Sequence, residues 1–128
     1  MVVSALLNLL SRGLVLCGGA AGQDAQVRLG LFAEGFSRPT AIAHAGDGSG
    51  RVFVVEQAGR IRAVGGDGSV STFLDIAGRV RCCGERGLLG LAFPPDFSQS
   101  RRFYLYYTDL NGDIVVCRCS GRPDGRGE

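Results

Sequence analysis

Lysine is absent from this chain of 128 residues, and all fourteen basic residues are arginines. The absence excludes chemistry that depends on a lysine amine, such as Schiff-base catalysis or phosphate binding by a P-loop lysine. The arginines are scattered and the net charge is only +2. The sequence therefore lacks the basic stripe that nucleic-acid binding needs, and we expect no nucleic-acid partner.

Long apolar runs are also lacking. The run before Arg12 is shorter than the roughly 20 residues of a membrane-spanning helix, so no stable membrane span is expected. Residues 1–22 instead predict a signal peptide, in which Ala20-Ala21-Gly22 supplies small residues for cleavage. The protein would then be secreted or periplasmic. The alternatives are a poorly packed N-terminal helix and a start codon placed too early.

A helical hydrophobic period is missing as well, whereas 21 glycines indicate many tight turns between short strands. Asp67-Gly68 and Asn111-Gly112 are the strongest hairpin signals, because these pairs tolerate the positive φ of a type I′ turn. Strands recur about every 10 to 12 residues, which favours a sandwich, a barrel or a propeller. The predicted strands are Val27–Phe32, Thr40–Ala45, Arg51–Glu56, Arg60–Val64, Val70–Ile76, Leu88–Phe93, Phe103–Thr108 and Ile114–Cys119.

The strand layout repeats with a period of roughly 40 to 50 residues, as propeller blades do. A propeller needs about four to eight blades to close its ring, and this chain holds fewer than two. We therefore predict an all-β fold made of the first one to two four-stranded antiparallel blades of a β-propeller. Residues 23–119 would form this part, residues 120–128 would be a disordered tail, and open sheet edges would favour self-association. Val27–Phe32 would join the last blade to close the ring, and would have no partner in this chain.

Three stretches occur in a fixed order: residues 36–43 (FSRPTAIA), 51–62 (RVFVVEQAGRIR) and 84–97 (GERGLLGLAFPPDF), the last followed by 103–108 (FYLYYT). Together they resemble the glucose/sorbosone dehydrogenase family, which also includes the hedgehog-interacting proteins. The resemblance implies a six-bladed propeller that oxidises sugar hydroxyls by hydride transfer to PQQ, with calcium as a second cofactor. An alternative within the resemblance is a non-catalytic extracellular propeller that acts as a binding module.

Two departures from the family pattern bear on activity. Pro94 stands where the family usually has a histidine at a strand end, and the histidine that serves as the catalytic base lies in a later motif, beyond this chain. His44, the only histidine here, is in a different place, beside the turn at residues 46–50. The arginines that clamp PQQ and the calcium ligands also belong to later blades. We therefore predict no catalytic, cofactor-binding or metal-binding residue in this chain, no bound cofactor and no turnover by it alone.

Glu85 is the one side chain for which we predict a functional contact. It occupies the position where family enzymes place a glutamine or glutamate at the mouth of the pocket, near the sugar. A carboxylate there can accept hydrogen bonds from sugar hydroxyls and orient the reacting C–H bond. The alternative is a solvated loop residue paired with Arg81 or Arg86.

The cysteines and one acidic motif leave other chemistries open. Cys82 and Cys83 are adjacent, and Cys117 and Cys119 face the same side of one predicted strand. The two clusters could bind zinc, form disulfides with one another, or remain free thiols, although zinc usually has two-residue spacers. The motif at residues 109–113 (DLNGD) resembles the start of a calcium loop but lacks its glycine and closing glutamate, so we interpret it as a turn.

Overall fold

The computed structural model describes residues 27–122 and residue 127. The predicted signal peptide, residues 1–22, lies outside the described residues. No helix within residues 27–122 is long and apolar enough to cross a membrane.

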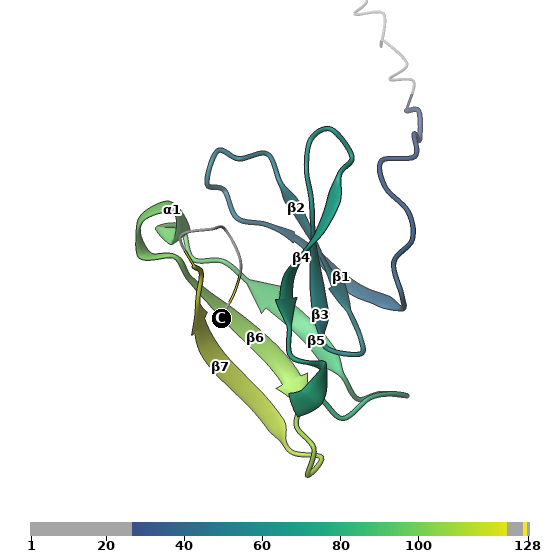
Figure 1. Ribbon diagram of the computed structural model, residues 1–128, viewed down its shortest axis with the longest axis vertical. Helices are drawn as coiled ribbons and strands as arrows, with labels where there is room; N and C mark the ends of the chain where they lie inside the picture. The colour runs from purple at the N-terminus through teal and green to yellow at the C-terminus, as the bar shows by residue number, and fades with distance from the viewer. Residues whose placement is uncertain (1–26, 123–126, 128) are drawn as a thin grey trace, which may run out of the picture.

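The first sheet has four antiparallel strands in sequence order (Figure 1). They are β1 (Pro39–His44), β2 (Val52–Glu56), β3 (Arg60–Val64) and β4 (Val70–Asp75). Each strand pairs with the next in an antiparallel hairpin. In the β3–β4 turn Asp67 Oδ1 accepts hydrogen bonds from the backbone N–H and the hydroxyl of Ser69, at 3.0 and 2.7 Å. A turn therefore forms where Asp67-Gly68 predicts one. It is not the type I′ turn expected, because only Gly68 of the pair has a positive φ, +80°.

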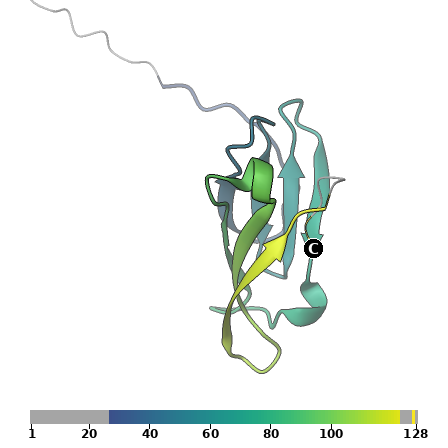
Figure 2. The same cartoon turned by 90° about the vertical axis from the view of Figure 1, so that its left-hand side faces the viewer.

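The second sheet has three antiparallel strands: β5 (Leu88–Ala92), β6 (Arg102–Thr108) and β7 (Ile114–Ser120). A 3₁₀ turn, η1 (Ala77–Arg79), precedes it, and a short helix, α1 (Phe97–Ser100), connects β5 to β6. Figures 1 and 2 show the two sheets side by side, with β5 next to the first sheet. β5 contacts both β1 and β2. The architecture confirms the all-β prediction of one four-stranded blade and part of a second.

Phenylalanines from both sheets fill the space between them. The ring centroid of Phe53 on β2 lies 4.9 Å from that of Phe73 on β4 and 4.8 Å from that of Phe93, which follows β5. Phe97 and Phe103 extend this cluster on the side of the second sheet. Phe53 and Phe103 are completely buried. These rings are the main apolar contact that holds one blade against the other.

The prediction of a strand at Val27–Phe32 is wrong for this structure. The segment forms no strand, and its apolar side chains Val27, Leu29 and Leu31 are 85, 99 and 81% exposed. It projects away from both sheets in Figure 2. A strand needs a neighbour to satisfy its backbone hydrogen bonds, and no described strand pairs with this segment. Its role in closing a ring stays a prediction.

Two other features differ from the sequence-based expectations. No helix was expected, but Phe97–Ser100 forms one turn of α-helix in which Phe97 is buried. Near the end of the chain, Gly121 N–H donates to Arg101 O and Gly127 N–H donates to Phe73 O. Ser120 is the last residue of β7, so the predicted disordered tail is wrong for Ser120, Gly121 and Gly127. Residues 123–126 and 128 lie outside the described residues, and for them it stays a prediction.

One face of the second sheet is not covered by any described segment. It carries a shallow apolar groove of about 270 Å³, lined by Gly90, Leu91, Ala92, Tyr104, Leu105, Tyr106 and Val116. Tyr104 and Tyr106 are each 39% exposed, and Val116 is 70% exposed. An apolar face of this kind favours association. Self-association through this part of the molecule stays a prediction.

Candidate functional site

The loop that contains Glu85 belongs to the connection from β4, the last strand of the first sheet, to β5, the first strand of the second. Residues Cys83 and Arg86 form an isolated antiparallel bridge, with Gly84 and Glu85 as the turn between them. Glu85 therefore lies at the tip of a small hairpin, and its side chain is exposed. Within residues 27–122 it forms no ion pair with Arg81 or Arg86. The paired alternative for Glu85 is thus not what the structure shows.

Gln57, in the turn between β2 and β3, holds this hairpin. Its side-chain Nε2 donates hydrogen bonds to the carbonyl oxygens of Gly84, at 2.6 Å, and of Arg86, at 3.0 Å. Its backbone carbonyl accepts a hydrogen bond from Leu88 N–H at 2.9 Å. The tip of the hairpin is therefore attached to the first blade, although it precedes the first strand of the second.

Gly87 makes this close approach possible. A Cβ atom at Gly87 would lie 2.5 Å from the carbonyl oxygen of Gln57 and 2.6 Å from its Cγ. Its φ of +142° is also a conformation that residues with a side chain rarely adopt. On the other side, Thr108 N–H at the end of β6 donates to Gly87 O at 3.0 Å. Gly87 thus joins the β2–β3 turn to the second blade.

Glu56, next to Gln57, is a buried acid with only 2% of its surface exposed. Its Oε1 accepts a hydrogen bond from Ser37 N–H at 2.9 Å, and its Oε2 lies 3.7 Å from Arg60 Nε. In addition, Gln57 N–H donates to Arg38 O at 3.0 Å. Glu56 and Gln57 therefore fix the segment before β1 to the same end of the blade that carries the Glu85 hairpin.

Neither Glu56 nor Gln57 was identified from the sequence. Both lie in the stretch of residues 51–62 that resembles the family, but the local pattern does not show which groups they contact. Their partners lie 19 to 29 positions away along the chain. Contacts at this separation become visible only once the hairpins are folded.

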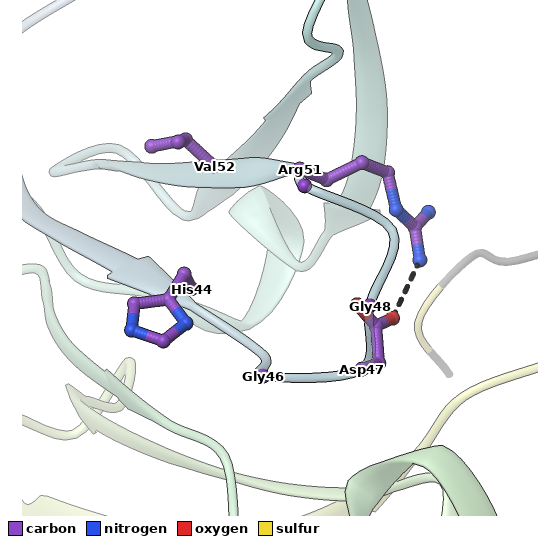
Figure 3. A pocket seen from close by; sticks show the side chains of 7 residues that line it. His44, Gly46, Asp47, Gly48, Arg51 and Val52 are labelled. Carbon is purple, nitrogen blue, oxygen red and sulfur yellow. Dashed lines mark hydrogen bonds and ion pairs between the residues drawn. The ribbon is translucent and has the colours of Figure 1, made fainter.

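The only histidine lies at the opposite end of the first blade. His44 pairs with Val52, whereas the Glu85 hairpin lies next to the Pro39–Glu56 end of the same strand pair. Five residues of strand separate the two ends, which is roughly 16 Å. His44 is exposed and, as Figure 3 shows, lines a cavity of about 540 Å³ with the glycine-rich turn before β2. It is not close enough to act together with Glu85.

The same cavity contains an ion pair between Asp47 and Arg51, at 3.3 Å (Figure 3). Burial acts to raise the pKa of Asp47, but hydrogen bonds from Ser49 and the Arg51 guanidinium outweigh it and lower the pKa below its usual value. Asp47 Oδ1 accepts from both the N–H and the hydroxyl of Ser49. These contacts stabilise the turn, as predicted for an aspartate between glycines.

Within residues 27–122 the cysteines form neither a zinc site nor a disulfide between the two clusters, and they are not all free thiols. Cys82 and Cys83 are joined to one another by a disulfide, and Cys117 and Cys119 are free, with sulfur atoms 3.5 Å apart. A disulfide between the clusters is therefore wrong. Cys117 pairs with Leu105, whereas the residues around Cys82 bond to Thr108, three positions further along β6. Three positions of strand are roughly 10 Å, too far for a bridge.

The acidic motif after β6 is a turn. Asp109 Oδ1 accepts hydrogen bonds from the backbone N–H groups of Asn111, Gly112 and Asp113, at 2.9 to 3.0 Å. Its oxygen is thus committed to the backbone of the hairpin. Within the part of the chain that the structure describes, no three His, Cys, Asp or Glu side chains lie together as metal ligands would.

The sequence profile of the family described as glucose/sorbosone dehydrogenase matches residues 36–120. The chain belongs to the glucose/sorbosone dehydrogenase family. The matched region begins just before β1 and ends at the last residue of β7, so it contains both blades and the Glu85 hairpin.

Solved structures of glucose/sorbosone dehydrogenase type have the same fold as this chain. A Thermus thermophilus protein described as a glucose dehydrogenase is 35% identical, with a TM-score of 0.63, and the match covers 75% of this chain and 28% of that one. The PQQ-bound aldose sugar dehydrogenase of Streptomyces coelicolor is 25% identical, with a TM-score of 0.66, and the match covers 78% and 31%. The β-propeller assignment is confirmed by these matches.

Among curated proteins, the chain is similar to the hedgehog-interacting proteins of mouse and human. Each is 34% identical over 80 residues, which is 58% of this chain and 11% of the relative. The chain thus spans about a tenth of these relatives and less than a third of the matched dehydrogenase structures.

The described residues contain no cluster of His, Cys, Asp and Glu side chains suited to calcium. The arginines at the Glu85 end, Arg38, Arg60, Arg81 and Arg86, come from separate loops and strands. We therefore assign neither PQQ nor calcium a ligand in this chain and derive no reaction step through either.

Proposed function

We propose that this chain supplies part of the sugar-binding mouth of a PQQ-dependent sugar dehydrogenase located outside the cytoplasm. The observation that carries the proposal is the position of Glu85, exposed at the tip of a hairpin that is hydrogen-bonded to the first blade. An exposed side chain on a fixed backbone is suited to contact a ligand that approaches from solvent. Family membership supplies the sugar as that ligand.

The chemical role of Glu85 is to accept hydrogen bonds. A carboxylate that accepts from a sugar hydroxyl forms a charge-assisted bond worth roughly 1.5 to 3 kcal/mol. The contact would select a hydroxyl-bearing substrate and fix its orientation, so that the reacting C–H bond faces the bound cofactor. Glu85 would therefore bind and orient the sugar, whereas proton abstraction would belong to a residue elsewhere in the protein.

The experiment is a chimeric enzyme in which residues 36–120 replace the matching segment of the Streptomyces coelicolor aldose sugar dehydrogenase. We expect Glu85→Ala in this chimera to lower kcat/KM for sugar about tenfold to a hundredfold, the kinetic equivalent of the lost bond. The affinity for PQQ should stay unchanged and should show that the variant is folded. Arg86→Ala is the matched control, because Arg86 is an exposed neighbour on the same hairpin. Equal kcat/KM in Glu85→Ala and the parent chimera would show that Glu85 is only a solvated loop residue.

A second candidate function is a non-catalytic extracellular binding module. The observation in its favour is the 34% identity to the hedgehog-interacting proteins over 80 residues. In this case the Glu85 end of the propeller would contact a protein ligand such as a hedgehog protein. Binding of a purified hedgehog ligand to the full chain, weakened by Glu85→Ala, together with no effect of that change on sugar turnover in the chimera, would favour this function.

A further inference from the structure

The side-chain amide of Gln57 contacts the backbone on both sides of Glu85. Nε2 donates to Gly84 O at 2.6 Å and to Arg86 O at 3.0 Å. Both partners are carbonyl oxygens, which only accept hydrogen bonds, so the NH₂ group must face them. The two N–H bonds of one amide thus hold the residue before Glu85 and the residue after it.

Gln57 is itself held in place by its own backbone. Its N–H donates to Arg38 O at 3.0 Å, and its carbonyl accepts from Leu88 N–H at 2.9 Å. Gly87 packs against its Cγ and carbonyl, where no Cβ could fit. The backbone of Gln57, which carries the side chain that holds the hairpin, is therefore fixed by contacts on both sides.

The Cys83–Arg86 bridge closes the base of the hairpin, but among the described residues the Gln57 amide is the side chain that bonds to its tip. Gly84 has a positive φ of +71° and nothing within 4 Å of a Cβ position, so its backbone has open space around it. Arg81 does not lie over the tip, since its Nη1 contacts Asn111 O at 3.4 Å instead. Within residues 83–87, the hydrogen bonds that the structure describes from a side chain to the hairpin backbone both come from the Gln57 amide.

We propose that Gln57 is a positioning residue for the sugar site, which holds the hairpin in the one conformation that presents Glu85 to the ligand. The proposal rests on the sugar-binding role proposed for Glu85. A mobile tip would have to be ordered each time a sugar binds, and that entropic cost lowers affinity. Loss of the Gln57 amide should therefore raise KM rather than lower kcat. Glu85 would keep its chemical identity and lose its fixed position.

The first test measures the hairpin itself, in the full 128-residue chain. Gln57→Met keeps the length of the side chain but removes both donors, whereas Gln57→Lys restores a donor at similar length. We expect the backbone order parameters of Gly84, Glu85 and Arg86 to fall from about 0.85 to below about 0.6 in Gln57→Met and to recover in Gln57→Lys. Leu88 is the internal control, because its N–H bonds to the Gln57 backbone. A rigid tip in Gln57→Met would overturn the proposal.

The second test asks whether Gln57 acts through Glu85, and uses the PQQ-loaded chimera. We expect Gln57→Met to raise KM for sugar about three- to tenfold with kcat unchanged, and Gln57→Lys to restore KM. In a Glu85→Ala background, Gln57→Met should have no further effect, because residues that act as one unit are not additive. An additive effect would mean that Gln57 only stabilises the fold, and would overturn the proposal.

The two tests separate failure of this proposal from failure of the proposed function. If Gln57→Met frees the tip while Glu85→Ala leaves sugar kinetics unchanged, the sugar role of Glu85 is overturned and the attachment of the hairpin by Gln57 stands. If Glu85→Ala lowers kcat/KM while Gln57→Met leaves both tip and KM unchanged, the sugar role stands and the positioning role is overturned.

Discussion

The glycines on either side of Glu85 give a matched pair of substitutions. Both have positive φ, +71° at Gly84 and +142° at Gly87, so alanine is conformationally unfavourable at each. Only Gly87 is crowded, because a Cβ there would lie 2.5 Å from the Gln57 carbonyl oxygen, whereas at Gly84 nothing lies within 4 Å. The difference between the two variants therefore reflects the close approach of the β2–β3 turn to the second blade, together with the rarer backbone conformation of Gly87.

The expected magnitudes follow from this geometry. Gly84→Ala should lower the free energy of unfolding by about 1 kcal/mol, the lower end of the cost of a left-handed alanine. Gly87→Ala should cost about 2 to 4 kcal/mol, because a displacement of the Gln57 carbonyl adds roughly 1 to 3 kcal/mol to a backbone cost of about 1 kcal/mol. Small domains are typically stable by about 5 to 15 kcal/mol, so both variants should be measurable.

Urea unfolding followed by circular dichroism measures the two losses, and a constant m-value shows that the unfolding transition is unchanged. The amide resonance of Leu88 gives a second observable, since its hydrogen bond to Gln57 O should shift only in Gly87→Ala. An equal or larger loss in Gly84→Ala would refute the reasoning, because it would mean that the turn and the Glu85 hairpin are not in contact.

Two further predictions concern the space between the blades. Phe53→Ala should lower the free energy of unfolding by about 3 to 5 kcal/mol in the same urea assay. Ile42→Ala, the control at a side chain that is 72% exposed, should change it by at most about 0.5 kcal/mol. Similar losses in the two variants would contradict the packing of the two sheets on Phe53. Burial, and after it the hydrogen bond and charge of Cys117, raise the pKa of Cys119 from 9.0 to about 12. Between about pH 9 and 12 the unfolded chain therefore loses this proton while the folded chain keeps it, and the free energy of unfolding should fall as the pH rises. Cys119→Ala should flatten that part of the stability profile, which no lysine complicates, and an unchanged slope would show that this thiol is not buried.

The hairpins were predictable because their signals are local. Turns such as Asp67-Gly68 set the strand ends, and the alternation of apolar residues set which face is buried. The strand at Val27–Phe32 was wrong because alternation indicates what a segment can do, while a strand also needs a partner that only the folded chain can supply. The helix at Phe97–Ser100 is a single turn, too short for a helical period to appear in the sequence.

The candidate site divides in the same way. Glu85 was predicted as a site residue through its motif, and that role stays a prediction. The contact that holds its hairpin was not predicted, because Gln57 lies 27 and 29 positions from its two partners. The bond between Cys82 and Cys83 was also missed. Spacing alone shows neither which sulfurs approach one another nor how far Cys117 lies from the loop, since both depend on the register of β6 and β7.

The contact between the two blades has a different chemical character at each of its ends. At the Glu85 end, directional hydrogen bonds join Gln57 to Leu88, and the Thr40 hydroxyl donates to Leu88 O at 2.9 Å. At the other end, around Phe53 and Phe93, the contact consists of aromatic rings, whose packing constrains the approach less strictly than hydrogen bonds do. If one blade tilts against the other, we expect the hydrogen-bonded end to act as the pivot and the aromatic end to take up the displacement. We therefore expect the Glu85 hairpin to move less than the far side of the molecule.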